Sequence, residues 1–173
     1  MIELKELEIK HENIDLDKYI NFREKVKQNM KHPEWLGDFS KEDIEDLLKN
    51  GSKIFVFFKN GKEVCSTMII PSTSRDIEKF GLDINYKETI DYGPTFVDDK
   101  FRGNRLQLQM TKYLDEYSIK KGYKYAVSTI HPDNIYSIRN LKEDCFEEIG
   151  YKEFKRGPRK IYMKKLALKL DNC

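Results

Sequence analysis

The feature that most constrains the fold is a β-strand pattern that passes into a long amphipathic helix through a short charged turn. Residues 89–97 alternate as a half-buried strand does, and apolar residues recur at helical spacing across residues 104–121. The turn between them, residues 98–105, contains a glycine with Arg102 and Arg105 on either side. The first N–H groups of a helix have no partner within it, and the helix dipole adds partial positive charge there. The sequence therefore predicts an anion site, of the kind that binds phosphate, at this turn.

The composition predicts one domain, residues 1–173, and argues against two kinds of partner. A chain of this length buries roughly 70% of the surface that its unfolded form exposes, so it needs no second domain. Lys and Arg number 32 against 30 Asp and Glu, and the net charge of +2 is too small for a broad nucleic-acid surface. No apolar run approaches the roughly 20 residues of a membrane helix, and the amino terminus lacks a secretory signal. We therefore expect a cytoplasmic protein that binds neither nucleic acid nor membrane.

The cysteines predict neither a metal site nor a redox motif. Cys65, Cys145 and Cys173 lie far apart and form no Cys-x-x-Cys pair, so we expect free thiols, with Cys65 buried in a strand. A nucleotide site of the G-x-x-x-x-G-K-[ST] class is also excluded, because no such run occurs. We expect no metal.

The remaining elements follow from caps, turns and periodicity. Asp15 or Asp17 is expected to cap a first helix, and Ser40 begins an acidic capping box before a second one. An Asn-Gly pair between two β-rich runs predicts a hairpin. The predicted order is one strand, two helices, three strands, helix, strand, helix and two strands. The strands are expected at residues 4–9, 54–58, 64–70, 89–97, 125–130, 151–155 and 160–166. This order predicts an α/β (α+β) fold with three layers and a mixed sheet.

Two turns add local detail. Gly93-Pro94 in the middle of the strand at residues 89–97 predicts a β-bulge, because proline cannot donate to a sheet ladder and glycine weakens one. The final hairpin is expected to turn over residues 156–159, with the basic pairs Lys155-Arg156 and Arg159-Lys160 beside it. These pairs have two interpretations, a solvated hairpin tip or a surface for an acidic acceptor.

Three motifs together give the chain a family resemblance. The run from Phe96 to Leu106, the run from His131 to Asn140 and the pair Gly150-Tyr151 resemble the GNAT N-acetyltransferase superfamily. The order of predicted elements also matches that family. The resemblance implies a mixed, mostly antiparallel twisted sheet of about seven strands, flanked by about four helices and splayed between the fourth and fifth strands.

The resemblance also implies acetyl-CoA as the acetyl donor and assigns residues to it. In this family a turn of the pattern Q/R-x-x-G-x-G/A binds the pyrophosphate, and Arg102 fills its first position. Arg105 and Gln107 stand where the pattern has glycine and glycine or alanine. We expect both to have ordinary helical dihedrals and outward side chains, since only N–H groups are required at the phosphates; Arg105 could also add a cation for phosphate. The residues implied to bind acetyl-CoA are Phe96, Val97, Arg102, Gly103, Asn104, Arg105, Leu106, Gln107, Asn134 and Ser137.

Four residues are candidates for catalysis or acceptor binding. Asp91 is a candidate general base, because strand alternation places it on the face of Gly93 and Thr95; the alternative is a hydrogen-bonded strand residue. His131, at the end of a strand, is a candidate base or acid, or else orders its loop. Tyr136 is a candidate acid for the CoA sulfur, since the family's usual tyrosine is missing, although packing would also explain it. Trp35 is a candidate wall of the acceptor site or a core residue.

These observations lead to two hypotheses of function. The first is an acetyl-CoA-dependent N-acetyltransferase that transfers an acetyl group directly to a small-molecule or peptide amine. The second is a CoA-binding regulatory or scaffold domain that is catalytically weak or inactive. The identity of the acceptor cannot be read from the sequence, and homodimer formation stays open.

Overall fold

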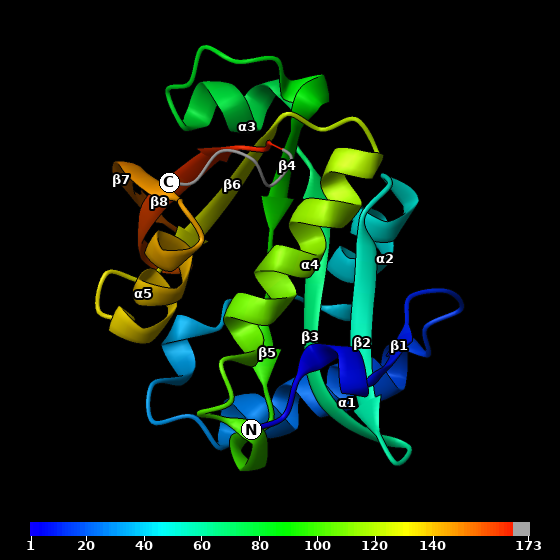
Figure 1. Ribbon diagram of the computed structural model, residues 1–173. Helices are drawn as coiled ribbons and strands as arrows, with labels where there is room; N and C mark the ends of the chain where they lie inside the picture. Colours follow the sequence, from blue (N-terminus) through cyan, green and yellow to red (C-terminus); the bar gives the residue numbers. More distant parts are fainter. Residues whose placement is uncertain (168–173) are drawn as a thin grey trace.

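The computed structural model describes residues 1–167 and has three layers around one twisted sheet (Figure 1). The sheet has eight strands in the order β1-β2-β3-β4-β6-β8-β7, and β5 pairs with β3 beside this path. β4 and β6 are parallel, while the other paired strands of the described chain are antiparallel. The strands are β1 (Glu8–Lys10), β2 (Lys53–Lys59), β3 (Lys62–Pro71), β4 (Thr89–Tyr92), β5 (Phe96–Val97), β6 (Tyr125–Ile130), β7 (Glu147–Phe154) and β8 (Gly157–Lys165).

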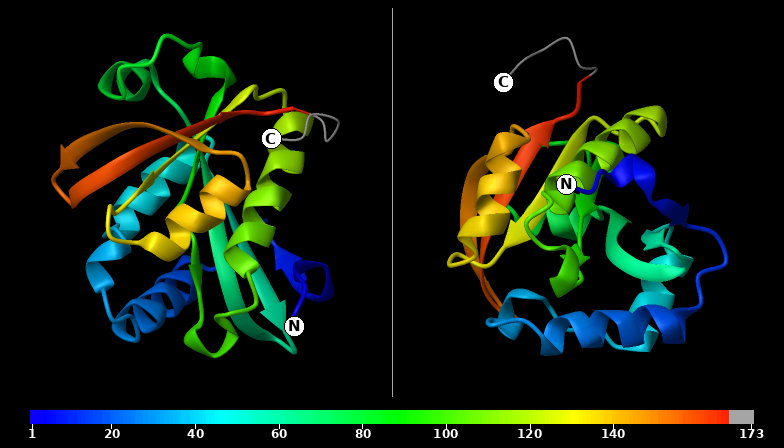
Figure 2. Two further views of the ribbon diagram at one scale, coloured as in Figure 1. Left: turned by 60° about the vertical axis from the view of Figure 1, so that its left-hand side comes forward. Right: turned by 60° about the horizontal axis from the view of Figure 1, so that its bottom comes forward.

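Helices cover both faces of the sheet. Figure 2 shows α1 and α2 on one face and α4 and α5 on the other. The helices are α1 (Leu16–Gln28), α2 (Lys41–Lys49), α3 (Ser74–Lys79), α4 (Leu106–Lys120) and α5 (Ile135–Glu143), with short 3-10 turns η1 (Leu4–Glu6), η2 (Pro33–Trp35), η3 (Tyr86–Glu88) and η4 (Asp99–Phe101). Local side chains fix the helix starts. Asp15 caps α1, and Ser40 and Asp43 form the expected capping box of α2.

The core has two parts, one on each side of the sheet. Met110 and Leu114 of α4 pack with Phe55, Ile90 and other strand residues on one side. On the opposite side, residues of α1 and α2, such as Phe22 and Ile44, pack on the other faces of the same strands. Burial of apolar surface on both faces explains why the alternating and continuous apolar runs of the sequence become central strands.

The predicted fold class is confirmed, with differences in detail. The sheet has eight strands rather than about seven, because the strand expected at residues 89–97 is interrupted. The fifth helix, α3, forms in a segment for which the sequence pattern was ambiguous, and Thr73 caps it. Of the first expected strand, residues 4–9, only Glu8 and Ile9 pair, as part of β1, since Glu3 and Glu6 cap a 3-10 turn ahead of it. The last hairpin turns at residues 155–156, earlier than expected.

The interruption of the fourth strand is a β-bulge, as predicted from Gly93-Pro94. From Tyr92 to Phe96 the chain advances four residues, whereas its partner β3 covers three, from Ile69 to Ser66. One extra residue is therefore placed on the bulged side.

The sheet splays directly after this point. β4 and β6 pair as far as Asp91 and Val127, while β6 continues to Ile130 without β4. β5 pairs with β3, and no strand of residues 1–167 pairs with it on its other side. The predicted splay between the fourth and fifth strands is thus present as a gap that opens toward both faces of the sheet.

The cysteines differ in part from expectation. Cys65 is buried in β3 and free, as predicted. The prediction of a free thiol is wrong for Cys145, which is disulfide-bonded. Cys173 lies outside the described residues.

Across residues 1–167 no helix combines the length and apolar character required to cross a membrane.

Candidate active site

A cavity of about 140 Å³ lies where β4 and β6 separate. Its walls come from seven parts of the chain: the end of β3, the bulged strand, the end of β6, the starts of α4 and α5, the segment around η2 and the β7–β8 hairpin. Residues that line it include Asp91, Pro94, Ser128, His131, Gln107, Asn134, Trp35, Arg156 and Arg159. Since α4 and α5 lie on one face of the sheet and η2 on the other, the cavity is bordered from both faces.

The turn before α4 leaves helix N–H groups without a side-chain cap. Asp98 accepts a hydrogen bond of 3.0 Å from the N–H of Lys100 and so starts the 3-10 turn η4. The chain then reverses through Gly103, whose φ is 83°. The N-cap residue of α4 is Arg105, and no side chain caps the helix. Arg102 is exposed and forms no ion pair within the described part of the chain, so an uncapped helix start and a free guanidinium lie in one turn.

Asp91 lies at the sheet end of the cavity, at the last paired position before the gap. Burial raises the pKa of its carboxyl to about 7, and the positive charge of Arg156 partly opposes this shift. The residue lines the cavity and is only half-buried, so its side chain is accessible from the cavity. A carboxyl with these properties loses its proton near neutral pH and can accept one from a molecule in the cavity.

His131 and Trp35 form the aromatic part of the lining. Their ring centroids are 6.3 Å apart, and Trp35 also stacks on His32 with 4.4 Å between centroids. Nδ1 of His131 accepts the N–H of Asp133 at 3.2 Å, so the proton of the neutral ring is assigned to Nε2. Nε1 of Trp35 is buried and has no hydrogen-bond partner within residues 1–167. Both aromatic rings therefore line the cavity, and the indole N–H of Trp35 can donate a hydrogen bond to a ligand there.

Several solved structures with a similar arrangement of elements are named as acetyltransferases. The chain is similar to an N-acetyltransferase from Staphylococcus aureus Mu50, with 20% identity over 93% of this chain and 99% of that one, and a TM-score of 0.68. It is similar to the ribosomal-protein-alanine N-acetyltransferase of Brucella melitensis, with 17% identity over 92% of this chain and 100% of that one, and a TM-score of 0.69. The aminoglycoside acetyltransferase AAC(6')-Ib in complex with acetyl-CoA has 14% identity over 92% of this chain and 93% of that one, and a TM-score of 0.67.

The chain has the GNAT fold. No protein-family model matches the sequence, and no curated protein does. At these identities the likeness concerns the fold, and the residues of the site must be judged by their own geometry.

Arg105 does not have the conformation expected of it. Its φ of 58° and ψ of 24° are left-handed, so the prediction of ordinary helical dihedrals is wrong. The position requires a positive φ to turn the chain into α4, which explains why a glycine would suit this slot of the GNAT pattern. The side chain of Arg105 forms an ion pair with Glu143 at the end of α5. It therefore joins α4 to α5 and is not a free cation like Arg102.

Replacing Arg105 by glycine should give a more stable protein than replacing it by alanine, by about 1 kcal/mol in the free energy of unfolding. Both variants lose the ion pair with Glu143, but alanine keeps the left-handed strain and glycine removes it. Urea unfolding of both variants measures the difference. The same pair at the exposed helical Lys112 is the control, where alanine should be the more stable by about 1 kcal/mol. Equal or reversed stability at Arg105 would contradict the left-handed assignment.

Gln107, the second departure from the GNAT pattern, also reaches toward α5. It lies in the first turn of α4 with helical geometry, as expected. Its side chain does not point outward, because Oε1 accepts hydrogen bonds from Ser137 Oγ at 3.1 Å and Asn140 Nδ2 at 3.0 Å. Asn134 uses Oδ1 to cap α5 through the N–H of Ser137 at 3.2 Å. These polar groups thus fix α4 against α5 beside the cavity.

The other residues implied to bind acetyl-CoA offer mainly their backbones. Asn104 accepts the N–H of Ile2 at 2.9 Å and donates to Phe101 O, so its side chain holds the amino-terminal segment against the turn. Leu106 is buried in the core. The side chains of Phe96 and Val97 pack on opposite faces of the sheet, while one backbone edge of β5 carries no strand. This edge is a row of groups that an extended ligand could pair with.

Tyr136 does not line the cavity with the other candidates. Its side chain lies in the first turn of α5, is 71% exposed and is absent from the cavity lining. The structure brings Asp91, His131 and Trp35 together but leaves Tyr136 apart, so it gives no support to the role predicted for Tyr136.

One group of buried charges was missed by the sequence reasoning. Lys164 of β8 forms ion pairs with Asp115 of α4 and with Asp144 after α5, the latter at 2.6 Å. The hydroxyl of Tyr92 donates to Asp115 at 2.9 Å. Burial raises the pKa of Asp115 to about 7, although Lys164 opposes this. Only the recurrence of charged residues on otherwise apolar faces could have pointed to this group, because its members lie far apart in sequence.

Within the described range, no cluster of three or more His, Cys, Asp and Glu side chains is arranged to hold a metal ion.

Proposed function

We propose that the protein is an acetyl-CoA-dependent N-acetyltransferase that transfers the acetyl group directly to an amine. The observation that carries the proposal is the gap between β4 and β6, with the raised-pKa carboxyl of Asp91 at its closed end. The uncapped start of α4 and the unpaired edge of β5 lie on the same stretch of chain. Similar solved structures have names that state acetyl transfer to nitrogen, and some are described with acetyl-CoA or CoA bound.

The residues present fit acetyl-CoA. Arg102 and the N–H groups of residues 103–107 would bind the pyrophosphate, since a free guanidinium and an uncapped helix start favour phosphate. The free edge of β5 would pair with the amide-containing arm, and Asn134 retains its Nδ2 for the same arm. Acetyl-CoA supplies the activated acyl group, and Asp91 and the acceptor lie at the other end of the gap.

The acceptor must lose a proton before or during the transfer. An alkyl amine with a pKa of about 10.4 is charged at neutral pH, and deprotonation there costs about 4 to 5 kcal/mol. Asp91, with a pKa of about 7, accepts that proton better than an ordinary aspartate would. Nε2 of His131, in the aromatic wall, would donate a hydrogen bond or relay a proton.

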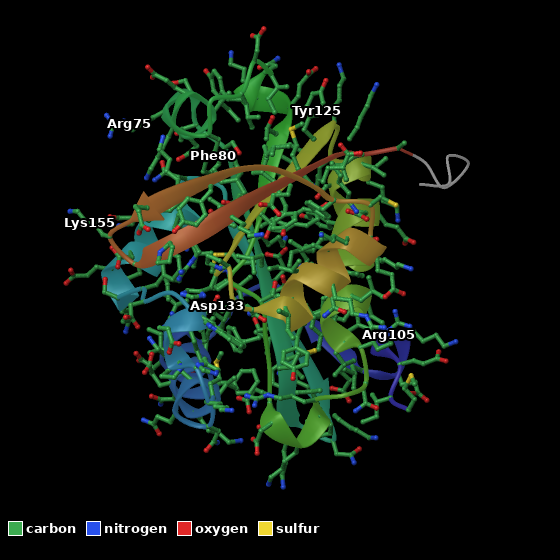
Figure 3. All side chains as sticks on the ribbon, turned by 90° about the vertical axis from the view of Figure 1, so that its left-hand side faces the viewer. Arg75, Phe80, Arg105, Tyr125, Asp133 and Lys155 are labelled. Atoms are coloured by element: carbon green, nitrogen blue, oxygen red, sulfur yellow. The ribbon has the colours of Figure 1, made fainter. Side chains whose placement is uncertain are left out.

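Replacing Arg102 by alanine is expected to weaken acetyl-CoA binding by about 10- to 100-fold, because a charged hydrogen bond to phosphate is lost. Isothermal titration with acetyl-CoA, CoA and a control nucleotide measures it. The matched control is Arg75→Ala. Arg75 is an exposed residue of α3, labelled in Figure 3, and its replacement removes the same charge at a different place on the surface. If wild type binds neither CoA species, the cofactor assignment fails. If both variants lose affinity equally, the loss reflects general charge and not a site at Arg102.

A second candidate function is a CoA-binding regulatory domain with little or no turnover. It is favoured by the exposure of Tyr136 and by Gln107, whose side chain occupies the position of a glycine or alanine. Thiol release in the presence of an amine panel separates the two functions. A protein that binds CoA without release of thiol above the rate of hydrolysis would be the regulatory domain.

A further inference from the structure

Two arginines of the β7–β8 hairpin line the cavity on the side away from α4. Arg159 is 2% exposed, and Arg156 is exposed at the rim. Figure 3 shows the hairpin tip, marked by Lys155, on the side of the sheet where α1 and α2 lie, while Arg105 lies on the α4 side. The two basic pairs of the hairpin thus separate: one arginine of each pair borders the cavity, Lys155 is exposed, and Lys160 pairs with Glu148 at 3.1 Å.

Neither arginine has a carboxylate partner. Arg159 donates to the carbonyl oxygens of Pro158 at 2.7 Å and Glu34 at 3.2 Å. Arg156 donates to Thr129 Oγ1 at 2.7 Å, and a Cβ added at Gly37 would lie 3.3 Å from its Nη1. Among residues 1–167 neither guanidinium forms an ion pair with a carboxylate, and their hydrogen bonds go to Thr129 Oγ1 and to carbonyl oxygens. Since each guanidinium has five N–H donors, both retain donors for a ligand.

An unpaired, buried guanidinium is costly, and a second one beside it adds repulsion. Both effects act on Arg159: burial and the positive charge of Arg156 each lower the pKa of its guanidinium. An anion placed between the two would relieve desolvation and repulsion together, and a planar carboxylate or a phosphoryl group matches guanidinium geometry.

The position of Asp91 relative to these arginines completes the pattern. Arg156 is close enough to lower the pKa of Asp91, yet the two do not form an ion pair within 4.0 Å. The cavity lining therefore combines one carboxyl with two cations that do not pair with it. A molecule with an amine and an anionic group matches this distribution of charge.

We propose that the acceptor amine carries an anionic group, a carboxylate or a phosphoryl group, which Arg156 and Arg159 bind while the amine faces Asp91. The proposal rests on the proposed function. The cavity of about 140 Å³ is smaller than the roughly 300 Å³ or more of sites for drug-sized ligands, which favours a compact acceptor such as an amino acid.

The first experiment tests the anion site without turnover. Thermal unfolding is measured with sodium phosphate, sodium acetate or sodium chloride at equal ionic strength, in an Arg102→Met background, so that phosphate at the start of α4 does not contribute. We expect phosphate and acetate to raise Tm above the chloride value, and Arg156→Met to abolish this rise. Arg75→Met is the matched control and should leave it intact. An absent rise, or an equal rise with and without Arg156, would overturn the proposal.

The second experiment uses the wild-type hairpin and measures acetyl transfer. Amino acids, aminoalkyl phosphates and the matching amino-acid carboxamides are compared as acceptors. The amine of a carboxamide has a lower pKa than the amine of the matching amino acid, so without the enzyme the carboxamide reacts faster. An anion site should make the amino acid the better acceptor. Arg156→Met should lower kcat/KM by about 10- to 100-fold more for the anionic acceptors than for the carboxamides, mainly through KM. The loss of the Arg156 charge also raises the pKa of Asp91, but this change affects both series alike. The better of the two anionic series identifies the anion.

Arg159 is tested by a conservative variant, because the loss of a buried side chain could unfold the protein. Arg159→Lys keeps the charge but loses the fork of donors, and should reduce the preference for anionic acceptors while the protein still binds acetyl-CoA. Transfer to carboxamides as fast as to amino acids, unchanged by Arg156→Met, would refute the anion site and leave the transferase standing. If the wild type does not bind acetyl-CoA, the proposed function is refuted. The Tm experiment would then still show whether the anion site exists, because it does not depend on acetyl-CoA.

Discussion

Replacing Asp91 by asparagine is expected to lower kcat by about 100- to 10,000-fold, because asparagine cannot accept the proton of the acceptor amine. The wild-type kcat should rise with pH up to about 7, where the Asp91 carboxyl loses its proton, and then level. The variant should lack this rise. Steady-state kinetics from pH 5.5 to 8.5 with saturating acetyl-CoA and acceptor measure both effects.

The same substitution should stabilise the folded protein at alkaline pH. The carboxyl has a pKa of about 7 in the fold and about 3.9 in the unfolded chain, so between these values the folded state binds more protons. Stability therefore falls as pH rises through this window, and above pH 7 the wild type bears the full cost of the buried charge. We expect Asp91→Asn to raise the free energy of unfolding by about 2 kcal/mol at pH 8 and by less at pH 5, since the cavity leaves the carboxylate partly solvated.

The exposed Asp83 provides the control for both effects. Asp83→Asn makes the same chemical change at the surface, outside the cavity lining, and should alter neither kcat nor stability appreciably. A catalytic base is indicated only if Asp91→Asn is both slower and more stable than the wild type. A slower but less stable variant would mean that Asp91 holds the bulge in place, and an unchanged kcat would remove it from the mechanism.

Replacing Lys164 by methionine is expected to cost about 3 to 5 kcal/mol of stability at pH 8, the largest structural effect that we predict. Lys164 is the cation between Asp115 and Asp144, and its ammonium also donates to Asp144 O at 3.1 Å. Without it two buried carboxylates repel each other, and Asp115, whose pKa is already raised to about 7, should titrate at still higher pH. Urea unfolding at pH 5 and pH 8 measures the cost.

The pH dependence distinguishes this explanation from a simple loss of packing. At pH 5 protonation of Asp115 removes much of the repulsion, so the variant should recover stability relative to the wild type as the pH falls. Lys160→Met is the matched control, because it lies on the same strand and pairs with Glu148 near the surface; it should cost less than about 1 kcal/mol. A cost for Lys164→Met that does not change with pH would contradict the electrostatic explanation.

Local signals predicted most of the fold. Asp15, Ser40 and the Asn-Gly turn act within a few residues, and the structure confirms the elements that they delimit. The bulge at Gly93-Pro94 was predictable for the same reason, since proline cannot donate to the ladder at all. The helix α3 was not, because its six residues lack a long apolar pattern and depend on the cap at Thr73.

The candidate site was predicted less completely, because it depends on contacts distant in sequence. Asp91 and His131 lie in elements whose ends could be placed, and they do line one cavity. The left-handed conformation of Arg105 could not be predicted from its residue type, because an arginine ordinarily has a negative φ. Arg159 was one of four hairpin cations with two interpretations, a solvated tip or a surface for an acidic acceptor. Its burial against the backbone of Glu34 is visible only in three dimensions.

The gap in the sheet bears on the design of ligands. The start of α4 and the hairpin arginines lie on opposite faces, and the cavity between β4 and β6 is bordered by both. A single molecule that joins a CoA-like arm to an anionic amine would have to pass through the gap between β4 and β6. It would enter from one face and bind on both faces of the sheet. Such a bisubstrate compound would have the affinity of two linked sites, and its linker length would measure the thickness of the sheet at the gap.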